Sequence, residues 1–399
     1  MATARDPQLV GVPAPALTAQ GESTTLPAWL QRIISPLDVP GEIETPSGEV
    51  FRCGSGSGGG QPRFRIRFLR DDLLRRPHDE FSLGRAYVNG EIELVGDMLA
   101  LLEARSQLAD RFRMWPWLRF LLNLWLKPAT RANQQAIEHH YTLGNEFYFS
   151  FLDTRYRFYS QCLFERDDET LEQAAERKLE VTWHALGLRP GMRMLDIGAG
   201  WGGTLEYFCP RGIRMTGITL FENSRSYVGD LIQRQNLNGE ISLQDFLTYR
   251  PHEPFDAILT YGVIEHMPDY EKFFQQVRRC LKPGGRIYID GSACKRKYAM
   301  SQFTRQYTWQ GAHSFMVLPE LVQHALDQGF QVEEIKQESH DYALTMLHWA
   351  QRFDRSREKI SRQWSEETYR LFRLFLWGGC HAFRKDGLQA YHVVARKSA

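Results

Sequence analysis

Residues 193–203, Arg-Met-Leu-Asp-Ile-Gly-Ala-Gly-Trp-Gly-Gly, decide the fold of this chain. The first five form a short, mostly apolar run, which predicts a parallel strand buried on both faces of a sheet. A glycine-rich turn follows, in which missing side chains allow a ligand to approach the backbone closely. Strand, glycine turn and a following helix are the nucleotide-binding arrangement of a doubly wound α/β sheet. The turn glycines are Gly198, Gly200 and Gly202.

Further strands are predicted downstream at spacings that suit the same sheet. They are residues 213–219, 241–243, 255–260 and 286–289. The last of them follows Leu-Lys-Pro-Gly-Gly at 281–285. With the GxGxGG spacing of the first turn, this order of elements resembles the S-adenosylmethionine-dependent methyltransferases.

Other motifs specify the kind of methyltransferase more closely than the glycine turn does. The chain resembles cyclopropane fatty acid synthases and mycolic acid cyclopropane synthases at His-Tyr-Thr-Leu-Gly-Asn (140–145), Phe-Tyr-Ser (158–160), Gly-Val-Ile-Glu-His (262–266) and Asp-Tyr-Ala-Leu-Thr (341–345). The resemblance implies a class I methyltransferase fold, which is α/β with a Rossmann-like, mostly parallel sheet of seven strands. It also implies a small N-terminal α+β domain that binds lipid, and a homodimer.

The resemblance implies S-adenosylmethionine as the cofactor. Tyr159 and Ser160 match the family pair that contacts its methionine end. Thr219 is expected on the ribose side, and Gln244 and Asp245 at the adenine. The glycine turn supplies the backbone contacts. Two more residues complete the predicted cofactor site: Asp196, which braces the turn, and Ile264.

In cyclopropane synthases a bound bicarbonate removes the proton, and the family motif places its ligands in this sequence. The glutamate is Glu265 and the tyrosine is Tyr342, and both are present. The cysteine position falls on Gln161 and the histidine position on Asp290, with Ser292 two residues on. The resemblance therefore gives Glu265, Tyr342, Asp290 and Gln161 as catalytic candidates.

The change to aspartate at position 290 suggests different proton chemistry. An ionised Asp290 beside Glu265 would repel the bicarbonate anion. We therefore hypothesise that Asp290 replaces bicarbonate as the proton acceptor, or that the product is methyl- or methylene-branched. The alternative is that Asp290 caps the following turn, as aspartate commonly does.

The reaction that the resemblance implies demands a water-free site, because an alkene is a poor nucleophile and its methylation leaves a carbocation. Aromatic side chains stabilise such a charge without reacting with it. Candidates are Tyr148, Phe149, Tyr159, Phe303, Tyr307, Trp309 and Phe315.

The amino-acid composition limits the kinds of partner and location that the protein can have. The chain has 399 residues and a net charge of +1, so it carries no overall field for nucleic acid. Six scattered cysteines without a CxxC pair predict neither disulfides nor a structural zinc, and no metal site is expected. We see no signal peptide and no run of apolar residues long enough to span a bilayer. These features predict a cytoplasmic protein, and the family resemblance implies that it associates peripherally with a membrane.

Composition also divides the chain. Residues 1–30 are predicted to be disordered, 31–110 to form the small α+β domain, 111–135 an aromatic helical linker, and 136–399 the methyltransferase domain. Two segments could touch lipid. Alternating Arg63, Arg65 and Arg67 could face headgroups or form a solvated strand face. The tryptophan-rich linker, with Trp115, Trp117 and Trp125, could enter a bilayer interface or pack between the domains.

Three functions compete. The first is C-methylation of the cis double bond of an unsaturated phospholipid acyl chain, which gives a cyclopropane or branched product through a carbocation. The second is N-, O- or C-methylation of a small molecule, for which the N-terminal domain and the tryptophan-rich segment would not be needed. The third is lipid binding without catalysis, which the intact glycine turn, Glu265 and Tyr342 disfavour.

Overall fold

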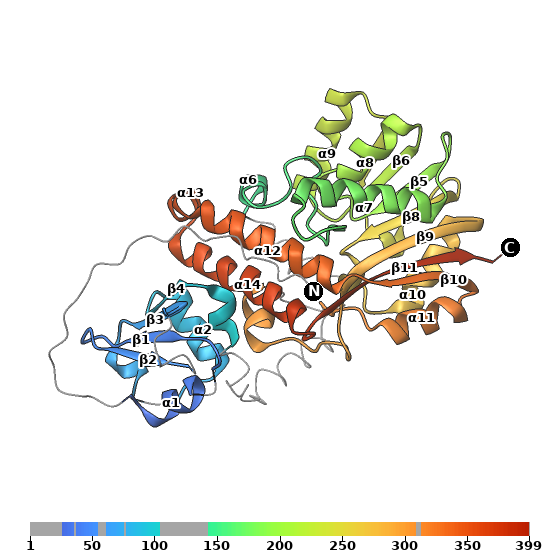
Figure 1. Cartoon of the computed structure of the whole chain (residues 1–399). Coiled ribbons are helices and arrows are strands. Elements are labelled where there is room, and N and C mark those ends of the chain that lie inside the picture. Colours follow the sequence, from blue (N-terminus) through green and yellow to red (C-terminus); the bar gives the residue numbers. More distant parts are fainter. Residues whose placement is uncertain are drawn as a thin grey trace. The chain divides into compact units, whose positions relative to one another are not determined.

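The computed structural model describes residues 26–35, 37–54, 61–75, 77–103, 143–308 and 313–398. The chain divides into two compact units (Figure 1). Met1–Pro77 and Glu91–Gln107 belong to the smaller unit, and His78–Gly90 and Leu108–Ala399 to the larger one. The predicted linker 111–135, Trp309 and the start of the motif at 140–145 lie outside the described residues, as does most of the predicted disordered segment.

The smaller unit is an α+β structure built on a four-stranded sheet in the order β2-β1-β3-β4. Its elements are α1 (Ala28–Ile34), β1 (Gly41–Glu44), β2 (Val50–Cys53), β3 (Phe64–Phe68), η1 (Asp71–Leu73), β4 (Ile92–Gly96) and α3 (Met98–Leu102). β2 and β3 do not pair with each other; each pairs with β1, which lies between them.

The arginines of the smaller unit are paired with acids. Arg65 lies 2.7 Å from Glu42, and Arg67 lies 3.0 Å from Glu44. Arg63 is paired with Asp97. Exposed pairs of this kind contribute about 0–1 kcal/mol each. The ion pairs favour a solvated strand face over a row of free cations awaiting lipid headgroups.

Residues 78–90 depart from the predicted domain boundary. They contain α2 (Glu80–Val88), which begins at the capping residue Asp79 and belongs to the larger unit, although 31–110 were expected to form one domain. The reason is packing, because Phe81 and Val88 share a core cluster with Phe303. The Tyr87 hydroxyl accepts a hydrogen bond of 3.1 Å from Arg373.

The larger unit contains the predicted sheet of seven mostly parallel strands, in the order β10-β11-β9-β8-β5-β6-β7. The strands are β5 (Arg193–Ile197), β6 (Arg214–Thr219), β7 (Gly239–Leu243), β8 (Phe255–Tyr261), β9 (Leu281–Ala293), β10 (Phe330–Gln337) and β11 (Gln389–Lys397). β11 runs antiparallel to both of its neighbours, and the pairs from β7 to β9 are parallel. This confirms the expected class I methyltransferase fold.

Helices cover both faces of this sheet, with α7, α8 and α9 on one side and α10 and α11 on the other (Figure 1). The helices are α6 (Asn145–Phe149), α7 (Leu171–Leu186), α8 (Gly203–Phe208), α9 (Glu222–Gln235), α10 (Tyr270–Cys280), α11 (Leu318–Asp327), α12 (Ser339–Arg355), α13 (Arg357–Gln363) and α14 (Glu366–Arg384). Short turns are η3 (Cys209–Arg211), η4 (Phe246–Thr248), η5 (Ile264–His266) and the π-helical η6 (Thr304–Thr308). α12 packs along α14.

Local sequence explains why α7 forms where it does. Thr170 and Gln173 make a capping box at its start, and Gly187 ends it at a φ of 62°. Its buried stripe includes Leu171, Leu179 and, unexpectedly for a charged residue, Lys178. This places a lysine side chain against the sheet.

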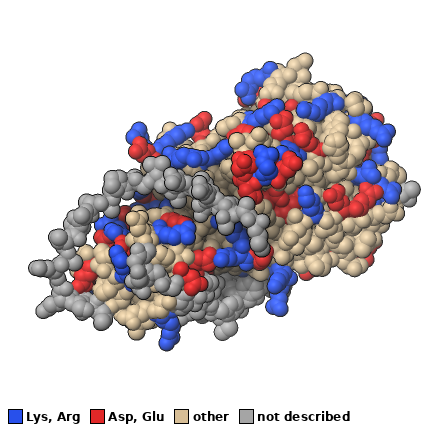
Figure 2. Space-filling model, in the orientation of Figure 1, with Lys and Arg blue, Asp and Glu red and all other residues tan. Residues whose placement is uncertain are grey.

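Basic and acidic side chains are interspersed over the coloured surface in Figure 2. This face therefore has no broad patch of one charge, as the net charge of +1 suggests. None of the helices within the described ranges is long and apolar enough to cross a bilayer.

Candidate active site

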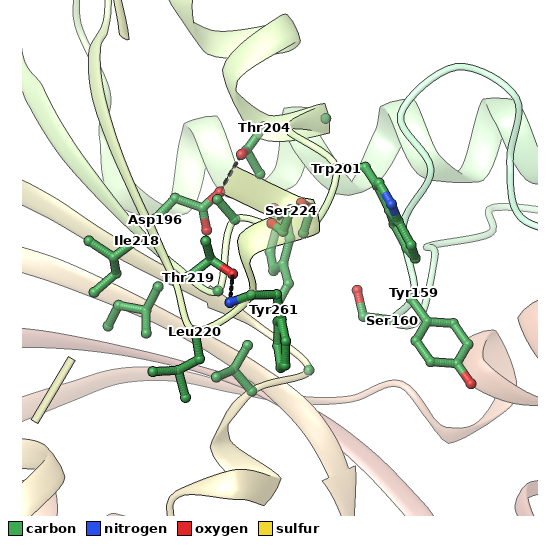
Figure 3. A pocket seen from close by; sticks show the side chains of 18 of the residues that line it. Tyr159, Ser160, Asp196, Trp201, Thr204, Ile218, Thr219, Leu220, Ser224 and Tyr261 are labelled. Carbon is green, nitrogen blue, oxygen red and sulfur yellow. Dashed lines mark hydrogen bonds between the residues drawn. The ribbon is translucent and has the colours of Figure 1, made fainter. Parts of the chain in front are cut away.

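A cavity of about 370 Å³ opens where β5, β6 and β8 end at the carboxyl edge of the sheet (Figure 3). Ligands bind at this edge in open α/β sheets, because the strand order reverses there. Tyr159 and Ser160 lie on one side of the cavity, and Asp196, Ile218 and Thr219 on the other. The predicted cofactor residues that line it are Tyr159, Ser160, Asp196, Gly198, Gly200, Thr219, Gln244 and Asp245.

Two of the predicted cofactor residues do not line the cavity. Gly202 has a φ of 77° and precedes α8, where a Cβ would lie 2.8 Å from Leu231, so it shapes the turn from behind. Ile264 is fully buried in the core cluster of the sheet. Its neighbours Val263 and His266 line the cavity instead.

The glycine turn is held tightly against β6 and the end of β8. The amide of Gly198 donates to the carbonyl of Ile218 at 2.9 Å. Gly198 has a φ of 77°, and a Cβ there would lie 2.5 Å from Val263 Cγ2. The turn therefore excludes side chains at the surface that a ligand would touch.

We expect Gly198→Ala to weaken binding of S-adenosylhomocysteine about tenfold or more, because left-handed backbone costs an alanine about 1–2 kcal/mol before any clash. Isothermal titration calorimetry measures this. The matched control is Gly229→Ala in α9, where the nearest atom to a Cβ would be 3.9 Å away. Equal affinities for Gly198→Ala and the wild type would contradict the prediction.

Asp196 connects the strand end to the helix behind the turn. It is 2% exposed, and its carboxylate accepts a hydrogen bond from the Thr204 hydroxyl in α8 (Figure 3). Burial raises the pKa of Asp196 to about 6. The side chain thus fixes the start of α8 relative to β5.

Aromatic rings form the wall of the cavity that comes from the segment before α7. The rings of Tyr148 and Tyr159 lie 5.4 Å apart, and Tyr148 lies 5.4 Å from Trp201. Trp201 donates a hydrogen bond of 2.8 Å to Asn145. Trp349 of α12 stacks on Tyr159 at 5.3 Å. Sequence reasoning identified the two tyrosines but neither tryptophan, because the contacts cross long stretches of chain. Such rings favour a cationic ligand.

Glu265 and Tyr342, the two catalytic candidates whose residue types match the family motif, come together with Ser292. The Glu265 carboxylate accepts a hydrogen bond of 2.7 Å from the amide of Ser292, and its second oxygen, Oε2, has no hydrogen-bond partner among the described residues. Burial, and then the charge of Asp290, raise the pKa of Glu265 to about 7. Burial and the charge of Glu265 raise the pKa of Tyr342, which hydrogen-bonds with Ser292. Glu265 therefore supplies a carboxyl group whose pKa is about 7, and Tyr342 supplies an uncharged phenol.

Asp290 occupies a different environment from the one expected. It is fully buried, and its Oδ2 lies 2.7 Å from Nζ of the equally buried Lys178. Its Oδ1 accepts a hydrogen bond of 2.7 Å from the amide of Gly262. The capping interpretation is wrong, since Asp290 lies within β9 and bonds to the end of β8. The Lys178 cation also offsets the repulsion of bicarbonate that we had ascribed to Asp290.

Lys178 is the residue that sequence reasoning missed. It donates to Ser160 Oγ at 2.7 Å, and its ammonium lies 3.7 Å from the centre of the Tyr261 ring. A signal existed, because Lys178 falls on the apolar stripe of the helix between Ala174 and Thr182.

None of the four catalytic candidates, Glu265, Tyr342, Asp290 and Gln161, is among the residues that line the cavity. Gln161 is fully buried and donates a hydrogen bond of 3.1 Å to Glu338 at the start of α12. The side-chain oxygen of Gln161, Oε1, has no hydrogen-bond partner among the described residues. His266, which follows Glu265, lines the cavity, and burial lowers its pKa to about 4.

Comparison with known proteins identifies the family. The family model for mycolic acid cyclopropane synthetase matches residues 129–393. The chain belongs to this family. It is an S-adenosylmethionine-dependent methyltransferase of the cyclopropane-fatty-acyl-phospholipid synthase type, and S-adenosylmethionine is its cofactor.

Individual relatives agree with this assignment. The cyclopropane-fatty-acyl-phospholipid synthase of Escherichia coli is 28% identical over 360 residues, which cover 86% of this chain and 91% of that protein. Sphingolipid C9-methyltransferase B of Emericella nidulans is 27% identical over 354 residues, or 84% of this chain and 69% of that protein. The crystal structure of mycolic acid cyclopropane synthase CmaA1 complexed with SAH and CTAB is 26% identical, with a TM-score of 0.62 over 68% of this chain and 100% of that one.

The residues of the cavity fit this cofactor. The backbone at Gly198 and Gly200 leaves room that side chains would fill, and the aromatic wall suits a sulfonium. Gln244 and Asp245 supply polar groups at the end of β7, where an adenine amino group would find acceptors.

Proposed function

We propose that this enzyme methylates the cis double bond of an unsaturated phospholipid acyl chain and releases a cyclopropane or branched acyl lipid. The observation that carries the proposal is the position of Glu265. It lies in η5, between Val263 and His266, which line the cofactor cavity, and it contacts Ser292 on β9. Glu265 itself does not line the cavity, but its carboxyl group lies directly behind two residues that do, and this supports its role as a proton acceptor. The membrane surface as the place of action, a cytoplasmic location and a homodimer stay predictions.

The chemistry assigns a separate task to each group of residues. When bound, S-adenosylmethionine supplies an electrophilic methyl group to the alkene. The aromatic wall with Tyr148, Tyr159 and Trp201 excludes water and stabilises the positive charge that develops on the acyl chain. Loss of a proton from the added methyl group closes the ring, and loss of a chain proton gives a methylene branch.

We propose that Glu265 itself accepts this proton. The family resemblance implies a bicarbonate held near Glu265 and Tyr342. The buried pair of Lys178 and Asp290 is neutral, so it does not repel such an anion, but it also leaves no free lysine charge to hold one. Both oxygens of Asp290 are engaged, so it supports the site rather than accepting the substrate proton. Glu265 Oε2, which has no partner among the residues described, is the better acceptor.

The rate should rise with pH as Glu265 loses its proton. Its pKa is raised to about 7, so the carboxyl is protonated and inactive as a base at lower pH. We expect kcat to reach half its maximum near that pH and to fall about tenfold for each unit below it. Asp290→Asn should shift this limb to lower pH, because the charge of Asp290 raises the pKa of Glu265. A profile that is flat between about pH 6 and pH 8 would argue against Glu265 as the base.

The direct test is mass spectrometry of acyl chains after incubation of the protein with S-adenosylmethionine and liposomes of cis-monounsaturated phospholipid, with and without added bicarbonate. A gain of one methylene per chain supports the proposal, and fragmentation distinguishes a ring from a branch. Turnover that depends fully on bicarbonate would overturn Glu265 as the direct acceptor. No gain in mass would favour a small-molecule substrate.

A further inference from the structure

Two buried ion pairs lie side by side on one face of the sheet. Asp290 of β9 and His392 of β11 are register partners, so their side chains emerge next to each other. Asp290 pairs with Lys178 of α7 at 2.7 Å, and His392 Nδ1 pairs with Glu338 at the start of α12. Lys178, Asp290 and His392 are fully buried, and Glu338 is 1% exposed. We call these four residues the charge network.

The charge network reaches two consecutive residues of the site. Lys178 donates to the hydroxyl of Ser160 at 2.7 Å, and Glu338 accepts from the side-chain amide Nε2 of Gln161 at 3.1 Å. Ser160 lines the cofactor cavity. Gln161 is the next residue and is fully buried. The two ion pairs thus hold adjacent residues, one through each pair.

This segment needs such support because it belongs to no helix or strand. Residues 150–170 connect α6 to α7 and lack the backbone ladders that fix regular elements. Instead, α12 holds them from behind, where Thr345 accepts from the amide of Cys162 at 2.9 Å and Asp341 from that of Phe164 at 2.7 Å. Ser160 and Gln161 are held through their side chains instead, and by charged groups.

We propose that the charge network positions Ser160 for the cofactor, and Gln161, whose side-chain oxygen has no partner among the described residues, for the transfer step, with Lys178 and Glu338 as the positioning residues. The second half rests on the proposed function, and the first does not. Each buried charge has a partner of opposite sign, and His392 also lies 3.3 Å from the half-exposed Glu334. The four residues lie on or beside α7, β9, β11 and α12, which are regular elements of the fold. Their hydrogen bonds therefore tie the irregular segment 150–170 to rigid parts of the structure.

Removal of one pair at a time should distinguish an effect on cofactor binding from an effect on turnover. Removing one complete pair avoids an uncompensated buried charge, and apolar or neutral replacements are often tolerated. Lys178→Met with Asp290→Asn releases Ser160, while Asn can still accept from Gly262. We expect this variant to raise the Kd for S-adenosylhomocysteine, measured by calorimetry, about tenfold or more.

Glu338→Met with His392→Phe releases Gln161. We expect this variant to lower kcat on monounsaturated phospholipid liposomes about 100-fold, because small misplacements of positioning groups have effects of this size. Its Kd for S-adenosylhomocysteine should stay within about twofold of the wild type. The conservative variant Glu338→Gln keeps an oxygen for Gln161 and should retain most of kcat.

Controls use matched exposed residues. Lys272→Met removes a lysine that is 71% exposed, and His340→Phe removes a histidine on α12 that is 69% exposed. Neither should change Kd or kcat. A Kd unchanged in Lys178→Met with Asp290→Asn overturns the proposal, whether or not the wild type acts on lipid. Equal losses of binding in both double variants would also overturn it, because they would indicate a general structural role.

Discussion

Glu265→Gln should lower kcat on monounsaturated phospholipid by about three orders of magnitude, because loss of a positioned general base removes about 10²–10⁴-fold of rate. Glutamine has nearly the same shape as glutamate and can still accept from the amide of Ser292, so the fold and the cofactor cavity should survive. The Kd for S-adenosylhomocysteine should therefore stay close to that of the wild type. Mass spectrometry of acyl chains over time measures the rate, and calorimetry the binding.

The control for this substitution is Glu271→Gln, which changes a glutamate of α10 that hydrogen-bonds to Gln275 near the surface. It should retain full activity. If Glu265→Gln keeps more than about a tenth of the rate, the proton leaves by another route. Restoration of that rate by bicarbonate would point to the anion as acceptor.

Lys178→Met alone should be the most destabilising single substitution at this site. It leaves Asp290 fully buried without its cation, and breaking a buried pair in this way costs about 3–5 kcal/mol. Burial raises the pKa of Asp290, while Lys178 counteracts that rise, so the variant should take up a proton there. The free energy of unfolding, measured in guanidinium chloride, should fall by that amount.

Two comparisons make this stability prediction specific. Adding Asp290→Asn to Lys178→Met should recover most of the loss, because it removes the unpaired charge and keeps an acceptor for Gly262. Lys272→Met at the surface should change stability by less than about 0.5 kcal/mol. If the single and double variants were equally unstable, packing of the lysine stem would explain the loss better than charge.

The sequence alone predicted the methyltransferase sheet, because its signals are local. A short apolar run and glycines that need positive φ specify β5 and the following turn without help from distant residues. The same holds for the α+β character of the smaller unit. Residues 78–90 were assigned to the wrong unit because the partners that bury α2, Phe303 among them, are more than 200 residues away in the chain.

The candidate site likewise has residues that sequence motifs located and environments that the motifs could not predict. Sequence motifs located Glu265, Tyr342 and the residues of the cofactor cavity, since each lies in a short recognisable pattern. The environment of Asp290 could not be predicted, because its cation is in α7 and its backbone partner at the end of β8. A carboxylate's chemistry depends on which charges and donors surround it after folding. The sequence by itself determined the fold and the kind of reaction. Only the tertiary structure decided that Lys178 neutralises Asp290 and that the pKa of Glu265 is raised to about 7. Both properties depend on burial and on contacts between distant segments of the chain.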